Sequence, residues 1–281
     1  MDRAKHTLGA GTLLWFVLLA AGASAQTNCN EGAGPLNNEQ PKGITVEGII
    51  QKFSAQENLF KEAQTHYTFT EDVSIQTLQG EDVDGEFRRV SDISFKNGKR
   101  FSYVTFAPQT SLRRISMEKE DFDDIENYSS FILTQENLPK YSLLYIGRQK
   151  VDEIEAYVLD VAPRQLEPGK RYFQGRIWVD DHDLQIVKTC GKNVPERAPS
   201  ADQKKKKKKK NQIPQESVSA TVVTYREQID GKYWFPTYVR SDETLHFIYG
   251  NDIHIREVIK YLRYKRAEMQ AGSAVVQAQQ P

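Results

Sequence analysis

The stretch that decides the fold begins 45 residues into the chain, where residues 45–75 read TVEGIIQKFSAQENLFKEAQTHYTFTEDVSI. In residues 45–64, apolar side chains recur every three or four positions, which predicts an amphipathic helix with one apolar stripe. From Tyr67 the period changes to two, so Tyr67, Val73 and Ile75 share one face of a strand. We therefore expect a helix that is followed directly by a sheet.

Downstream, the strand alternation continues in segments that are separated by turn residues. Asn97-Gly98 and Asp230-Gly231 tolerate positive φ and predict tight hairpins. Asp181-His182-Asp183 predicts a further turn, because aspartate suits turns. The segments predicted as strands are 67–75, 87–95, 100–107, 141–149, 154–162, 171–180, 184–190, 217–229, 232–241, 244–249 and 253–264.

These segments predict a mainly β fold with helices (α+β), built as a curled antiparallel sheet or half-open barrel of about 10–11 strands. Open twisted sheets rarely stay flat beyond about ten strands, so a sheet of this size should curl and need a cover for its inner face. The helix over 45–64 is the predicted cover. Phe122, Ile125 and Tyr128, at helical spacing, predict a second, short helix over 118–128 that assists it.

The chain ends and one internal stretch differ in composition from this sheet. Residues 1–25 combine a basic start with an apolar core and the small-residue site Ala23-Ser24-Ala25, which is typical of a cleaved secretion signal. We interpret 26–42 as a flexible leader, 43–266 as a single domain with a disordered lysine-rich insertion at 195–215, and 267–281 as a disordered tail. The mature protein is therefore predicted to be exported, to the periplasm or beyond, and soluble.

The formal net charge of zero conceals an uneven distribution. Without residues 1–25 the chain has 36 basic and 37 acidic residues, and without the lysine run at 204–210 the balance falls to 29 against 37. An acidic body disfavours nucleic-acid binding, which needs a basic face. Two interpretations of the run remain open: a solvated loop insertion, or a contact to an anionic membrane surface. The run comprises Lys204, Lys205, Lys206, Lys207, Lys208, Lys209 and Lys210.

The sequence contains no catalytic or metal-binding signature. Nucleophile-elbow, Walker and dinucleotide glycine patterns are absent, as are the His and Cys spacings of zinc sites. We therefore predict a protein that is not an enzyme and needs no cofactor or metal. The mature chain has two cysteines, Cys29 and Cys190, which could pair in an oxidising compartment or remain unrelated thiols.

One hairpin and the strand after it carry a resemblance to a known family. The hairpin reads YSLLYIGRQKVDEIEAYVLDVAP over 141–163, and FQGRIWVD over 173–180 is followed by LQIVK over 184–188. Together with the early amphipathic helix, these segments resemble the outer-membrane lipoprotein-sorting family and its periplasmic lipoprotein-carrier relatives. The resemblance implies a half-open antiparallel barrel closed by helices, with an apolar cavity that holds acyl chains, in a Gram-negative periplasm.

From the resemblance we expect an exported, non-enzymatic binding or carrier protein for lipids or lipoprotein acyl chains, with the helix over 45–64 acting as a lid. An envelope sensor or protein-interaction module on the same scaffold is the alternative. The cargo and the oligomeric state are left open. The residues predicted to line the apolar cavity are Ile49, Ile50, Phe53, Phe173, Ile177 and Val179.

Overall fold

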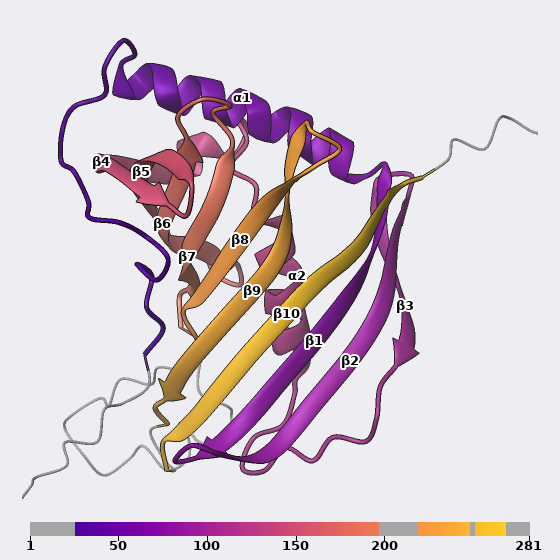
Figure 1. Ribbon diagram of the computed structural model, residues 1–281. Helices are drawn as coiled ribbons and strands as arrows, with labels where there is room; N and C mark the ends of the chain where they lie inside the picture. The colour runs from indigo at the N-terminus through magenta and orange to yellow at the C-terminus, as the bar shows by residue number, and fades with distance from the viewer. Residues whose placement is uncertain (1–25, 197–218, 248–250, 268–281) are drawn as a thin grey trace, which may run out of the picture.

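The fold is known from a computed structural model, which describes residues 26–196, 219–247 and 251–267, without the side chains of 127–130 (Figure 1). The predicted signal at 1–25, the run Lys204–Lys210 and nearly all of the predicted tail lie outside the described residues. No helix in the described part is long and apolar enough to cross a membrane.

Ten antiparallel strands form one curled sheet in the order β3-β2-β1-β10-β9-β8-β7-β6-β5-β4, which confirms the predicted fold class. The chain is a meander apart from one step, in which the last strand pairs with the first. The elements are α1 (Val46–Gln64), β1 (Tyr67–Gln79), β2 (Asp82–Lys96), β3 (Lys99–Phe106), α2 (Lys119–Ser130), the short 3-10 helix η1 (Leu138–Lys140), β4 (Tyr141–Val151), β5 (Ile154–Pro163), β6 (Tyr172–Asp180), β7 (Ile186–Val194), β8 (Val222–Ile229), β9 (Tyr233–Leu245) and β10 (Ile253–Arg266).

Two predicted hairpins form at the expected residues. Asn97-Gly98 and Asp230-Gly231 all have positive φ, as such two-residue turns require. The strand predicted over 232–241 continues to Leu245 as β9 and so takes in the first two residues of the segment 244–249, which was predicted as a separate strand. Ten strands result where the sequence predicted ten or eleven.

Helix α1 begins where the side chain of Thr45 accepts a hydrogen bond from the Gly48 backbone N–H. Its stripe of Ile49, Phe53 and Phe60 is buried against the sheet. Leu59, one of the apolar residues of the segment predicted as an amphipathic helix, is half exposed. The helix therefore covers the sheet with a narrower apolar face than the sequence suggested.

Both helices lie on the same face of the sheet, which we call the inner face. Helix α1 packs on β5 and β6, where Phe53 shares a core with Ile177 and Val179. Helix α2 packs on the middle of the sheet, where Ile125 meets a second core of Phe69, Val73, Ile75, Ile93, Val222, Val239, Ile259 and Tyr261. The opposite face, the outer face, buries Trp178 and Val223 in a third core.

Part of the leader predicted over 26–42 is hydrogen-bonded to the sheet. Gly34 and Asn37 donate backbone hydrogen bonds to Lys150 and Arg148, so residues 32–37 run along the free edge of β4. Cys29, earlier in the leader, is disulfide-bonded to Cys190 on the outer face of β7. Cys29 and Ala33 of the leader pack against the outer-face core and cover part of it.

Candidate functional site

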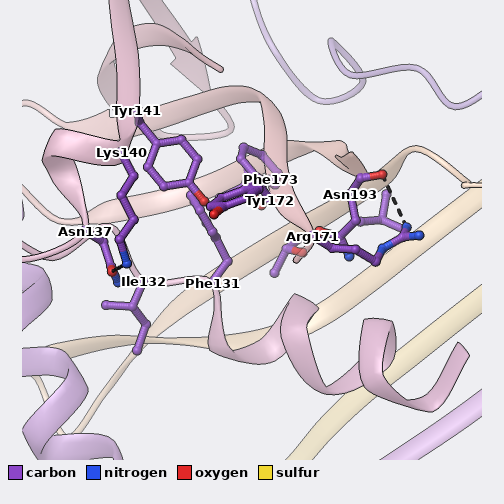
Figure 2. A pocket seen from close by; sticks show the side chains of 12 residues that line it. Phe131, Ile132, Asn137, Lys140, Tyr141, Arg171, Tyr172, Phe173 and Asn193 are labelled. Atoms are coloured by element: carbon purple, nitrogen blue, oxygen red, sulfur yellow. Dashed lines mark hydrogen bonds between the residues drawn. The ribbon is translucent and has the colours of Figure 1, made fainter. Parts of the chain in front are cut away.

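A cavity of about 220 Å³ lies on the inner face, between the segment that joins α2 to β4 and strands β6 to β8. Figure 2 shows its lining side chains. A second hollow, of about 300 Å³, lies at the end of α1, where exposed charged side chains such as Glu62 and Lys232 form much of the lining. We take the first cavity as the candidate site, because it lies on the covered inner face and aromatic side chains line it.

Aromatic rings form one wall of the cavity. The rings of Phe131 and Phe173 are stacked with centres 4.2 Å apart, and the Tyr141 ring lies edge-on to Phe131 at 6.4 Å. The Phe173 ring packs against Gly191 on the neighbouring strand, where an added Cβ atom would lie 2.7 Å from two of its ring carbons. Glycine at 191 therefore allows the ring to take its place in the wall.

A charged network forms the opposite side of the cavity. The Arg171 guanidinium lies 3.1 Å from a carboxylate oxygen of Asp124 on α2 and donates a hydrogen bond to the Asn193 backbone carbonyl (Figure 2). The Asn193 side chain donates to the other oxygen of Asp124 at 2.9 Å. Because Asp124 is buried, this network fixes α2 to β6 and β7 and places a cation beside the cavity.

A second cation lies at the rim. Lys140 is exposed and donates a hydrogen bond to the Asn137 side chain across one turn of η1, at 3.2 Å. Tyr172, beside it in the lining, donates its hydroxyl proton to Glu167, and this hydrogen bond raises the pKa of Tyr172 to about 12. The tyrosine therefore remains neutral, and Lys140 and Arg171 supply the positive charge of the lining.

The cover above the cavity is joined to α1 through Arg226 on β8. Its guanidinium donates to the Glu57 carboxylate at 2.8 Å and to the Phe131 backbone carbonyl at 2.7 Å. Both charged side chains are almost fully buried. Burial raises the pKa of Glu57, and the neighbouring Arg226 opposes that shift. One arginine thus connects the helix, the cover and the sheet.

The six residues predicted to line an apolar cavity lie together, but mostly in solid core. Ile49, Phe53, Ile177 and Val179 are fully buried in one cluster, with Ile50 packed against it. Only Phe173 lines the cavity. The apolar inner surface that the sequence predicted is thus filled by α1, and the cavity lies beside it.

Other lining residues had no signal in the sequence. Phe131 and Lys140 lie in the connection between α2 and β4, where no periodicity marks an inward direction. Arg171 precedes β6 and gave no motif. The tyrosine at 141, which opens the hairpin quoted above, was the one residue whose place in a recognisable segment could have drawn attention to this site.

The lining combines apolar, polar and cationic surfaces. It has an aromatic wall, hydroxyl and amide groups on its floor, and two cations at its sides. Within the described ranges no group of His, Cys, Asp and Glu side chains could hold a metal ion. An amphiphile with an anionic head group fits these surfaces, since its apolar part would meet the rings and its charge would meet Lys140 or Arg171.

The fold and the cavity together define a class: a curled antiparallel sheet whose helix-covered inner face contains a small mixed cavity. No family model matches the sequence, and no curated protein matches it. Among solved structures, a LolA superfamily protein from Nitrosomonas europaea is similar at 13% identity and a TM-score of 0.34, over 81% of this chain and 96% of that one.

Two further structures are the Pseudomonas aeruginosa MucA/MucB complex and MucB in complex with MucA(peri). The first has 12% identity and a TM-score of 0.21, over 77% of this chain and 99% of that one. The second has 13% identity and a TM-score of 0.19, over 76% and 98%. At these identities and scores, the likenesses do not assign the chain to a family.

Proposed function

We propose that this chain is an exported, non-enzymatic binding or carrier protein for lipids or lipoprotein acyl chains in the cell envelope. The observation that carries the proposal is the cavity on the inner face, with aromatic rings on one side and cations at its sides. Such a site recognises both parts of an anionic amphiphile. Each methylene group that leaves water for an apolar surface contributes about 0.8 kcal/mol.

The size of the cavity indicates how much of a ligand it accepts in the described conformation. A dry cavity of about 150 Å³ binds benzene, and pockets for larger ligands span about 300–1,000 Å³. At about 220 Å³, the cavity accommodates part of one acyl chain. Uptake of a whole chain therefore requires the cover to move and uncover more of the inner face.

The segment 131–140 is a better candidate for this movement than α1. Helix α1 is held by the buried Glu57–Arg226 pair and by a fully buried apolar stripe. The segment 131–140 is held at its start, where Phe131 accepts a hydrogen bond from Arg226 and Leu133 is buried, but its second half contains only a short 3-10 helix and ends at the exposed Lys140. We therefore place the lid at 131–140 rather than at the helix that the sequence had suggested.

The test is a direct search for a ligand. The protein is purified without detergent from its native compartment and analysed by native mass spectrometry, and a delipidated sample is titrated with a fluorescent fatty acid. We expect a stoichiometric acylated ligand in the first experiment and saturable uptake in the second. Lys140→Met should weaken uptake of the fatty acid but not of its uncharged methyl ester.

An empty protein that also fails to take up the fatty acid would rule the proposal out. The protein-interaction alternative would then remain for the same scaffold. If Lys140→Met takes up the acid and its ester as well as wild type does, the acyl site stands, but Lys140 has no part in recognising the head group.

A further inference from the structure

The edge strand β3 exposes large apolar side chains that the rest of the fold does not use. Phe101 is 51% exposed, Tyr103 74% and Phe106 50%. Pairing with β2 sets Phe101 opposite Ser94 and Tyr103 opposite Asp92, so the three rings lie on the outer face. We call Phe101, Tyr103 and Phe106 the β3 aromatic row. Three exposed aromatics on one short strand are typical of a binding surface.

The main chain of β3 also lacks a neighbour on one side. The strand is the last in the sheet order, and no further strand pairs with it among residues 26–196, 219–247 and 251–267. The opposite edge is treated differently, because residues 32–37 run along β4 and hydrogen-bond to it. The fold thus covers one edge with an extended segment and leaves the other available.

We propose that β3 binds an extended segment of a partner protein, which adds to the sheet as a further strand. The unpaired N–H and C=O groups of β3 would supply the affinity, and the aromatic row would receive apolar side chains at alternate positions of the segment. This inference is independent of the inner-face cavity, since the row lies on the outer face.

The charges around the row indicate what kind of segment fits. Lys96 and Lys99 face each other at the hairpin end, on the same face as the row, and neither has an ion-pair partner within the described parts of the chain. At the other end, Arg88 pairs with Asp72 and lies over the Phe106 ring. We therefore assign to the segment an acidic residue beside the hairpin Asn97-Gly98.

Two other occupants fit less well. A membrane would leave the unpaired main-chain groups of the edge without hydrogen-bond partners in hydrocarbon, which is costly. A second copy of the chain, paired antiparallel through β3, would leave Lys99 of each copy without an acidic partner, because β3 contains no acidic residue. An acidic extended segment avoids both costs.

The test begins with photo-crosslinking of the full chain in its own cells. Tyr103 is replaced by the photo-reactive residue benzoylphenylalanine, and crosslinked peptides are sequenced by mass spectrometry. The same probe at Leu144, which is 65% exposed on β4, is the matched control. We expect the probe at position 103, and not the control, to capture one protein segment with apolar residues at alternate positions and an acidic residue at one end.

A second measurement distinguishes strand addition from simple contact. A synthetic copy of the captured segment should slow hydrogen exchange of the β3 amides, and a copy N-methylated at alternate residues should not. The double variant Phe101→Ser/Tyr103→Ser should weaken binding about tenfold, and Leu144→Ser should leave it unchanged. Capture of lipid, of a second copy, of residues 268–281 of the same chain or of nothing would overturn the proposal, as would unchanged exchange of β3.

Discussion

Lys188 on β7 is a fully buried cation on the outer face. Its ammonium group donates to the Glu31 backbone carbonyl at 2.9 Å and lies over the rings of Trp178 and Tyr225. Burial lowers the pKa of Lys188 to about 8. The unfolded chain therefore holds this proton up to a higher pH than the folded chain does.

This difference predicts how stability depends on pH. Between the folded pKa near 8 and the ordinary lysine pKa of about 10.4, the unfolded chain binds more protons, so the free energy of unfolding rises with pH, by about 3 kcal/mol across the window. Below this window Lys188 is charged in both states, so the destabilisation caused by its burial does not change with pH. We expect Lys188→Met to be more stable than wild type at pH 7.5, with a difference that shrinks toward pH 10.5.

Urea unfolding of both proteins at several pH values measures this difference. The buried tyrosines titrate in both proteins, so their contribution cancels when the two free energies of unfolding are subtracted. Parallel stability curves for the two proteins would contradict the lowered pKa of Lys188.

Arg226 supports a second prediction at this scale. Its removal in Arg226→Met leaves the Glu57 carboxylate buried without its partner and frees the Phe131 carbonyl. We expect a loss of about 3–5 kcal/mol in the free energy of unfolding. The double variant Glu57→Leu/Arg226→Met should recover part of it, because no buried charge is left alone. A double variant as unstable as Arg226→Met would show that the pair itself is not the cause.

The buried pair of Glu57 and Arg226 was not predicted from the sequence, because the two residues lie far apart along the chain. Glu57 and Arg226 are separated by 169 residues, and each stands among polar neighbours that are typical of a solvated face. Periodicity shows which face of an element is apolar, but it does not show which polar residue finds a buried partner. The same holds for Arg171 and Asp124 beside the cavity.

At the scale of elements, the leader is the segment for which the structure adds most to the sequence prediction. Its disulfide closes a loop between residues 161 apart in sequence, and its hydrogen bonds cover the β4 edge. We expect the double variant Cys29→Ser/Cys190→Ser to lose roughly 2–5 kcal/mol in the free energy of unfolding. Hydrogen exchange should become faster at Arg148 and Asp152, whose amides donate to the leader.

Wild type treated with a thiol reductant should behave as this variant does. Unchanged exchange at Arg148 and Asp152 would mean that the leader stays on the β4 edge without its disulfide.

The elements that were predicted correctly share a local cause. Helix α1 and the turns at Asn97-Gly98 and Asp230-Gly231 depend on residues a few positions apart, so a single sequence is enough to predict them. The leader follows from contacts with strands more than 100 residues away, and its polar composition gave no sign of them. The cavity could likewise be expected on the inner face but not located. Its cover is the connection between α2 and β4, where no periodic pattern indicates which residues face inward.

For the whole molecule, the two faces of the sheet have different roles. The outer face at β4 to β8 is closed by the leader, its disulfide and a solid core. The inner face is closed by α1 over one core and by α2 over another, and the cavity lies beneath the segment that joins α2 to β4. A change that fills the inner face should therefore affect ligand uptake, and an equal change on the outer face should not.

Val222→Trp tests this division. Val222 lines the cavity from β8, and a tryptophan there occupies space that a ligand would use. Leu262→Trp is the matched control, because Leu262 lies opposite Thr70 on the outer face and is 43% exposed. We expect Val222→Trp to reduce uptake of a fluorescent fatty acid at least tenfold, equivalent to about 1.4 kcal/mol, and Leu262→Trp to leave it within twofold.

Circular dichroism establishes that both variants fold, since overpacking a buried site costs about 1–3 kcal/mol. Equal uptake by two folded variants would place the ligand elsewhere than the inner face. Reduced uptake in Val222→Trp alone would locate it beneath the segment 131–140, where the stacked rings of Phe131 and Phe173 would have to part as the acyl chain enters.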